Sequence, residues 1–146
     1  MPDADEYADL ARFHTLGDQP IPTVVHDVAR GAEIDLVWRN ELGGLTFRTA
    51  DKHVKWNPVT SGIDLRLERD RLEWVSRRHP APLVVDYGED SHQQWLVMKS
   101  LPGDHAVGDE WRRRTDEAIH AIADGLRAIH SIPTDRFPQA WICLLY

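Results

Sequence analysis

The sequence predicts an α+β fold, with about five antiparallel strands, one inserted helix, and an amphipathic helix after the sheet. Two observations support this prediction. Short runs of β-forming residues alternate with turn signals from residue 34 to residue 98, and apolar residues recur at helical spacing in two longer segments. A length of 146 residues suits one compact domain with a single core.

The first two predicted strands are residues 34–39 and 45–49, both rich in β-forming side chains. They are separated by Asn40-Glu41-Leu42-Gly43-Gly44, which predicts a hairpin with a glycine-containing turn. Before them, the run TVVHDV at 23–28 fits a strand or a helix, and the pattern alone does not decide. Residues 1–20 are polar and mixed, so we expect a short helix or a loose arm there.

The third predicted strand covers residues 52–56 and ends before Pro58. Because side chains alternate across a strand, Val54 and Trp56 belong on one face and His53 and Lys55 on the other. The strand therefore presents a lysine on the face opposite its apolar pair.

A helix capped by Ser61 or Asp64 is predicted to run to about residue 78. Its apolar stripe is formed by Leu65, Leu72 and Val75. Glu68 interrupts that stripe, three residues after Leu65, so its carboxylate should point toward the protein. The alternative is a solvated glutamate beside Arg69 or Arg71.

Residues 83–87 and 94–98 are predicted as two more strands joined by a turn at 88–91, and Leu101-Pro102-Gly103-Asp104 then ends regular structure. Thr115 should cap a second helix that stops before Pro133. Its apolar face consists of Ile119, Ile122, Leu126 and Ile129. Such a helix needs a packing partner.

Charge and composition exclude several classes of protein. A formal net charge of −7 argues against a nucleic-acid partner. No apolar run approaches the roughly 18 residues of a membrane helix, and the acidic start is unlike a secretory signal, so we expect no membrane partner and a cytoplasmic location. The histidines show no spacing typical of a zinc site and are expected to be surface or core residues: His26, His53, His79, His105, His120 and His130.

This order of parts is that of the small lobe of a kinase fold. The segments VWRNELGGLTFR, HVKWNP, DLRLERDRLEW, WLVMKSLPG and GLRAIHSIP resemble aminoglycoside phosphotransferases, particularly the 3′-type, over roughly residues 33–138. The resemblance implies a leading segment at 1–32, a nucleotide-binding small lobe at 33–101, and a hinge with the first large-lobe helix at 102–138. Residues 139–146 are expected to be a divergent tail, because the resemblance ends at Phe137-Pro138.

The resemblance also implies roles for individual residues. Lys55 would grip the α- and β-phosphates of ATP or GTP, and Glu68 would hold that lysine in place. The turn containing Gly43 and Gly44 would close over the phosphates, although it lacks the full G-x-G-x-x-G spacing. Backbone groups of the hinge would contact the base, and the hinge residues are Met98, Lys99 and Leu101.

The family's catalytic His-Gly-Asp segment and its later metal-binding aspartate do not occur in these 146 residues. We therefore assign no catalytic residue and no Mg²⁺ ligand, and interpret the chain as truncated before the catalytic loop and inactive alone. A truncated or frame-shifted gene product is the simplest explanation. The complete enzyme would transfer a phosphoryl group from the nucleotide to an aminoglycoside and confer antibiotic resistance.

Two alternatives stay open. One is another small-molecule kinase of this fold, acting on choline, fructosamine or homoserine. The other is a non-catalytic nucleotide-binding remnant, stabilised by self-association through the exposed face of the helix at 115–130.

Overall fold

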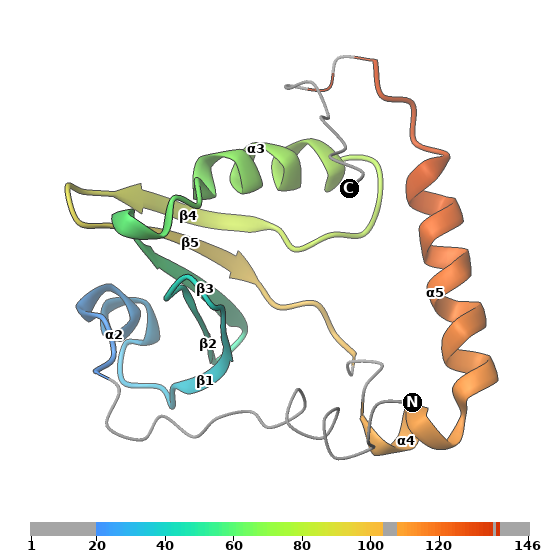
Figure 1. The fold of residues 1–146 in the computed structure, drawn as a ribbon, viewed down its shortest axis with the longest axis horizontal. Helices are drawn as coiled ribbons and strands as arrows, with labels where there is room; N and C mark the ends of the chain where they lie inside the picture. Colours follow the sequence, from blue (N-terminus) through green and yellow to red (C-terminus); the bar gives the residue numbers. More distant parts are fainter. Residues whose placement is uncertain (1–19, 104–107, 136, 138–146) are drawn as a thin grey trace.

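The computed structural model describes residues 20–103, 108–135 and 137 (Figure 1). Its helices are α2 (Thr23–Ala29), α3 (Leu65–Val75), α4 (Asp109–Arg113) and α5 (Thr115–His130), with a short 3-10 turn η1 (Val59–Ser61). Its strands are β1 (Asp35–Arg39), β2 (Leu45–Thr49), β3 (Lys52–Pro58), β4 (Val84–Glu89) and β5 (Gln93–Lys99). Within the described residues, the predicted α+β fold is confirmed.

The five strands form one sheet in the order β1-β2-β3-β5-β4, and every neighbouring pair is antiparallel. Helix α3 is inserted between β3 and β4 in the chain. Because β5 pairs with both β3 and β4, the strand that follows the helix lies at the sheet edge and the last strand lies inside. Figure 1 shows α3 running along the β4–β5 side and α2 beside β1 and β2.

The two faces of the sheet are buried by different helices. On one face, Val54 of β3 lies opposite Phe47 and Val97, and this cluster packs around Val25 of α2. On the other face, Leu96 and Met98 of β5 pack around Leu65 of α3. Directly paired residues of neighbouring strands share a face, so the register places Lys55 beside Leu96 and His53 beside Met98 on the α3 face.

Residues 23–29 are helical, which decides the question that the TVVHDV run left open. A helix buries both Val25 and Ala29, which are four residues apart and therefore lie on one helical face. The helix ends at Ala29, and the next two residues, Arg30 and Gly31, both adopt positive φ. Residues 1–19 of the expected N-terminal arm lie outside the described residues, as do the expected tail at 139–146 and His105.

Two predicted caps are resolved by the side-chain geometry. Asp64 caps α3, since its carboxylate accepts from the Arg66 N–H, and the helix ends at Val75 rather than near residue 78. Thr115 does not cap α5, so that prediction was wrong. Thr115 is the first helical residue and its hydroxyl donates to the Arg112 carbonyl, because α4 ends at Arg113 and leaves Arg114 as the residue between the two helices.

The apolar face of α5 is open among the described residues. Ile119, Ile122, Leu126 and Ile129 are 46–58% exposed, and Figure 1 shows the helix set apart from the sheet. The four apolar residues are exposed on an amphipathic helix, which we expect to need a packing partner. Within the described ranges, no helix combines the length and apolar character needed to cross a membrane.

Candidate functional site

The centre of the candidate site is an ion pair between Lys55 and Glu68. Lys55 Nζ donates to Glu68 Oε1 at 2.6 Å, joining β3 to α3 across 13 residues of sequence. The Lys55 and Glu68 side chains are 36% and 34% exposed, so water screens the pair. Its contribution to the free energy of unfolding should be near the ~1 kcal/mol of surface pairs, below the ~3–5 kcal/mol cost of breaking buried ones.

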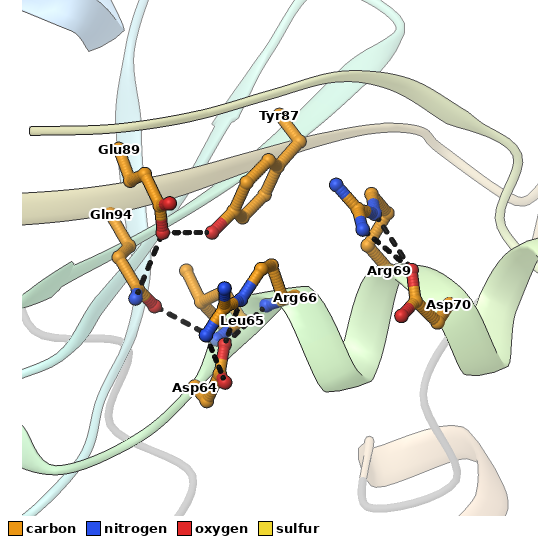
Figure 2. Close-up of polar contacts among 8 residues, drawn as sticks. All are labelled: Asp64, Leu65, Arg66, Arg69, Asp70, Tyr87, Glu89 and Gln94. Atoms are coloured by element: carbon orange, nitrogen blue, oxygen red, sulfur yellow. Dashed lines mark hydrogen bonds and ion pairs between the residues drawn. The ribbon is translucent and has the colours of Figure 1, made fainter. Parts of the chain in front are cut away.

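The position of Glu68 depends on how α3 is attached to the sheet. Figure 2 shows the attachment at the start of the helix, where the Leu65 N–H donates to Gln94 Oε1 at 2.9 Å. The Gln94 amide in turn donates to Glu89 at 3.4 Å, and the Tyr87 hydroxyl donates to the same carboxylate oxygen at 2.6 Å. The Leu65 N–H is in the first turn of α3 and has no acceptor within the helix. The Gln94 side chain of β5, itself bonded to Glu89 of β4, supplies that acceptor.

The Tyr87 hydroxyl stays protonated over the whole physiological range. Burial, and then the hydrogen bond to Glu89, raise the pKa of Tyr87 to about 12. A protonated phenol can donate and a phenolate cannot. The Tyr87–Glu89 bond that supports α3 is consequently insensitive to pH near neutrality.

Arg69 lies next to Glu68 in sequence but is directed elsewhere. Its guanidinium donates twice to Asp70 and lies over the Tyr87 ring, 4.7 Å from the centroid (Figure 2). Glu68 instead accepts from Lys55. The structure thus favours the inward orientation of Glu68 over the alternative of a glutamate solvated beside Arg69.

The turn between β1 and β2 is organised by Asn40. Its side-chain oxygen accepts from the N–H groups of Leu42 (3.0 Å) and Gly44 (2.8 Å), and its backbone carbonyl accepts from Gly43 (3.2 Å). Three amides expected to face phosphate are therefore already paired within the turn. Sequence reasoning missed this function of the Asn40 side chain, although asparagine before a glycine turn is a known signal for it.

Each glycine of the turn is required for a different reason. Gly43 has φ of 86°, a conformation that favours glycine. Gly44 leaves no room for a side chain, because an added Cβ would overlap Asn57 Oδ1 and the Asn40 side chain. The turn is therefore held in one shape by close packing as well as by hydrogen bonds.

The expected hinge is hydrogen-bonded to the residues that immediately precede β4 and β3. The Lys99 N–H donates to the Leu83 carbonyl and the Ser100 N–H donates to the Asp51 carbonyl, both at 2.8 Å. Met98 is buried, whereas Lys99 is exposed and Leu101 is half exposed. The backbone contacts expected of Lys99 and Leu101 toward a base stay predictions.

Ser100, in the expected hinge, makes a contact that the sequence did not predict. The Ser100 hydroxyl lies 2.8 Å from His53 Nδ1. The alternation along β3 had placed His53 on the same face as Lys55 but gave no indication of its contact with residue 100. Among the described residues, no group of three or more His, Cys, Asp or Glu side chains could hold a metal ion.

The fold agrees with comparisons to known proteins. Residues 55–143 match the model of the phosphotransferase enzyme family, APH, and the chain belongs to that family. The match continues five residues beyond Pro138, where we had expected the resemblance to end.

The relatives are aminoglycoside-modifying enzymes by name. The chain is 40% identical over 84 residues to the aminoglycoside 3′-phosphotransferase of Streptomyces fradiae, covering 56% of this chain and 31% of that protein. It is 31% identical over 131 residues to the streptomycin 3″-kinase of Streptomyces griseus, covering 84% and 47%. The solved structure of the aminoglycoside phosphotransferase APH(3″)-Id from Streptomyces rimosus superposes with a TM-score of 0.63 at 27% identity, covering 78% and 42%. The chain thus spans less than half the length of each of these relatives.

A test of the glycine turn follows from its packing. Gly44→Ala should lower the free energy of unfolding by about 1–3 kcal/mol, because the added methyl overlaps the Asn40 and Asn57 side chains. Urea unfolding followed by circular dichroism measures the change. Gly125→Ala in α5 is the control, since its Cβ meets open space and alanine favours a helix by up to ~1 kcal/mol. Equal stability of Gly44→Ala and the native chain would contradict the packing argument.

Proposed function

We propose that this chain is the nucleotide-binding part of an aminoglycoside O-phosphotransferase that uses ATP or GTP and confers antibiotic resistance. The observation that carries the proposal is the Lys55–Glu68 pair at 2.6 Å, in a chain of the phosphotransferase family. The names of the relatives support the substrate class, and they include both 3′ and 3″ enzymes, so the proposal extends to either position of attack.

In this proposal the face of β3 that carries Lys55 binds the triphosphate. The lysine ammonium lies between the α- and β-phosphates and offsets their charge, while Glu68 fixes its position. Residues 33–101 act as the small lobe and residues 102–138 as the hinge and first helix of the next lobe. The Lys99 carbonyl and the Leu101 N–H contact the base, and the turn at Gly43 and Gly44 lies over the phosphates.

The transfer step needs groups that the described residues do not supply. The γ-phosphoryl group leaves the β-phosphate oxygen and bonds to a hydroxyl oxygen of the aminoglycoside, whose proton must pass to a base. The His-Gly-Asp segment that would supply this base in the family does not occur in the sequence. Mg²⁺ must also be held, and among the described residues no group of three or more His, Cys, Asp or Glu side chains could hold a metal ion. We propose that the remainder of the complete enzyme supplies the base, the metal ligands and the aminoglycoside pocket, and that it acts in the cytoplasm, where nucleotide is available.

Two alternatives to an aminoglycoside phosphotransferase predict different responses to acceptor substrates. Another small-molecule kinase of the same fold would keep the Lys55–Glu68 pair and nucleotide binding but respond to choline, fructosamine or homoserine. A non-catalytic remnant would bind nucleotide and respond to none of these acceptors.

Nucleotide binding tests the role of the ion pair. Lys55→Ala should abolish the binding of Mg-ATP that we expect in the millimolar range for the native chain, and Glu68→Ala should weaken it about tenfold, because the lysine loses its orienting partner. Isothermal titration calorimetry measures both affinities.

Lys52→Ala is the matched control, since this lysine lies on the same strand with its side chain on the opposite face. It should bind Mg-ATP as the native chain does. Equal affinity of the native chain and Lys55→Ala would remove Lys55 from the site.

Catalysis by the 146-residue chain gives a second test. We expect no aminoglycoside-dependent release of ADP in a coupled assay with kanamycin, neomycin and streptomycin, because positioning and electrostatic stabilisation supply nearly all of the catalysis in phosphoryl transfer. Turnover that requires both an aminoglycoside and Lys55 would show that the chain holds its own base, for which Asp104, Asp109 and Asp116 are the candidates.

For the isolated chain we further propose self-association through α5. Its exposed apolar side chains follow a 3-4-3 spacing, with acidic residues in the first turn (Asp116, Glu117) and basic residues in the last (Arg127, His130). An antiparallel second copy would bury both apolar faces and place the acidic turn of one helix beside the basic turn of the other.

Sedimentation velocity between 5 and 200 µM, a range of ordinary protein interactions, tests this. The native chain should change from monomer to dimer, and Ile122→Glu should stay monomeric because it places a charge in the buried seam. Val85→Glu, at an exposed position of β4, is the control and should dimerise normally. A native chain that is monomeric throughout would rule the interface out.

A further inference from the structure

Helix α3, which carries Glu68, is held most firmly at its first turn. The Leu65 side chain packs on β5, and the Leu65 N–H is bonded to Gln94. Among the described residues of α3, Leu65 alone is fully buried, and Leu72 packs on the same cluster but stays partly exposed. A helix fixed at one end can pivot about that end. A second contact farther along α3 would therefore fix the direction of Glu68.

Trp74, in the last turn of α3, makes such a contact with Phe137, which follows α5 in the chain. The two ring centroids are 4.9 Å apart and the ring planes meet at 81°, which is the edge-to-face arrangement that aromatic pairs prefer. Nine residues separate Trp74 from Leu65, and at 3.6 residues per turn they lie on opposite sides of the helix. Phe137 therefore contacts the side of α3 that faces away from the sheet.

The Trp74 ring is itself held by its own helix. The Arg78 guanidinium lies 4.3 Å from the ring centroid and donates to the Trp74 carbonyl at 2.9 Å. The indole Nε1 atom is buried and has no hydrogen-bond partner in the described part of the chain. The aromatic ring, rather than its N–H, therefore makes the contact with Phe137.

We propose that Trp74 and Phe137 are positioning residues for the nucleotide site. Their contact fixes the outer side of α3, and α3 in turn directs Glu68 to Lys55. The inference rests on the proposed function, because it assumes that Lys55 binds the triphosphate. It makes nucleotide affinity depend on the segment that follows α5, so that the small lobe binds nucleotide best when this segment is packed on α3.

Removing either ring tests the contact. An aromatic pair commonly changes an equilibrium by about two- to tenfold, so Phe137→Ala and Trp74→Leu should each weaken Mg-ATP binding by about threefold. Trp74→Phe should bind as the native chain does, because it keeps a ring and loses an N–H that has no partner. Val85→Ala, at an exposed position of β4, is the control and should bind normally. NMR titration measures these weak affinities, and equal affinity of Trp74→Leu and Trp74→Phe would overturn the inference.

A double-mutant cycle tests whether the effect passes through Glu68. If the Trp74–Phe137 contact acts by directing Glu68, Phe137→Ala should cause no further loss of ATP affinity in a chain that already carries Glu68→Ala. A general loosening of the fold would instead weaken binding by the same factor in both backgrounds. That second result would contradict the positioning role.

Hydrogen exchange without nucleotide separates this inference from the proposed function. The amides of α3 should exchange faster in Phe137→Ala than in the native chain, because the helix has lost its outer contact. Thermal melts monitored by circular dichroism verify that each variant is folded. Unchanged ATP affinity in Phe137→Ala, with affinity still lost in Lys55→Ala, would refute the positioning role alone, whatever the exchange rates. Equal ATP affinity of the native chain and Lys55→Ala would refute the proposed function and this inference together.

Discussion

The alternation of side chains along β3 is the constraint on which the rest of the site depends. Val54 must enter the core with Phe47 and Val97, and this places Lys55 and His53 on the opposite face. A slip of one residue in the register would bury the lysine and expose the valine. The same constraint that builds the core therefore selects which side chains of β3 face α3.

The second requirement is a helix at the correct distance from that face. Helix α3 is held by apolar packing of Leu65 on Leu96 and Met98, and by the hydrogen bond from its first N–H to Gln94. Since Leu96 is also the cross-strand neighbour of Lys55, the packing that seats α3 is adjacent to the ion pair. The contacts that stabilise α3 on the sheet therefore also set the geometry of the ion pair. A substitution that displaces the first turn of α3 would displace Glu68 as well, because both belong to one helix.

Much of this could be predicted from the sequence, and the failures have physical causes. Strands with clear alternation and the inward direction of Glu68 were predictable because they follow from local periodicity. The helix at 23–29 was not, since TVVHDV contains β-branched residues and its helical state depends on burial of Val25 against the sheet. The contact between His53 and Ser100 joins residues 47 positions apart and follows only from the strand register. The function of Asn40 was missed because its side-chain oxygen accepts from two turn amides at once, while its backbone carbonyl accepts from a third, and these contacts exist only when the turn is formed.

The turn around Asn40 has a consequence for selectivity. Its amides already have acceptors, so a ligand oxygen that reaches them replaces a neutral carbonyl oxygen and the number of hydrogen bonds stays the same. An uncharged ligand would gain almost nothing from that exchange, whereas an anionic oxygen would gain the difference between a neutral and a charge-assisted hydrogen bond. The loop would then discriminate by the charge of its ligand rather than by its shape.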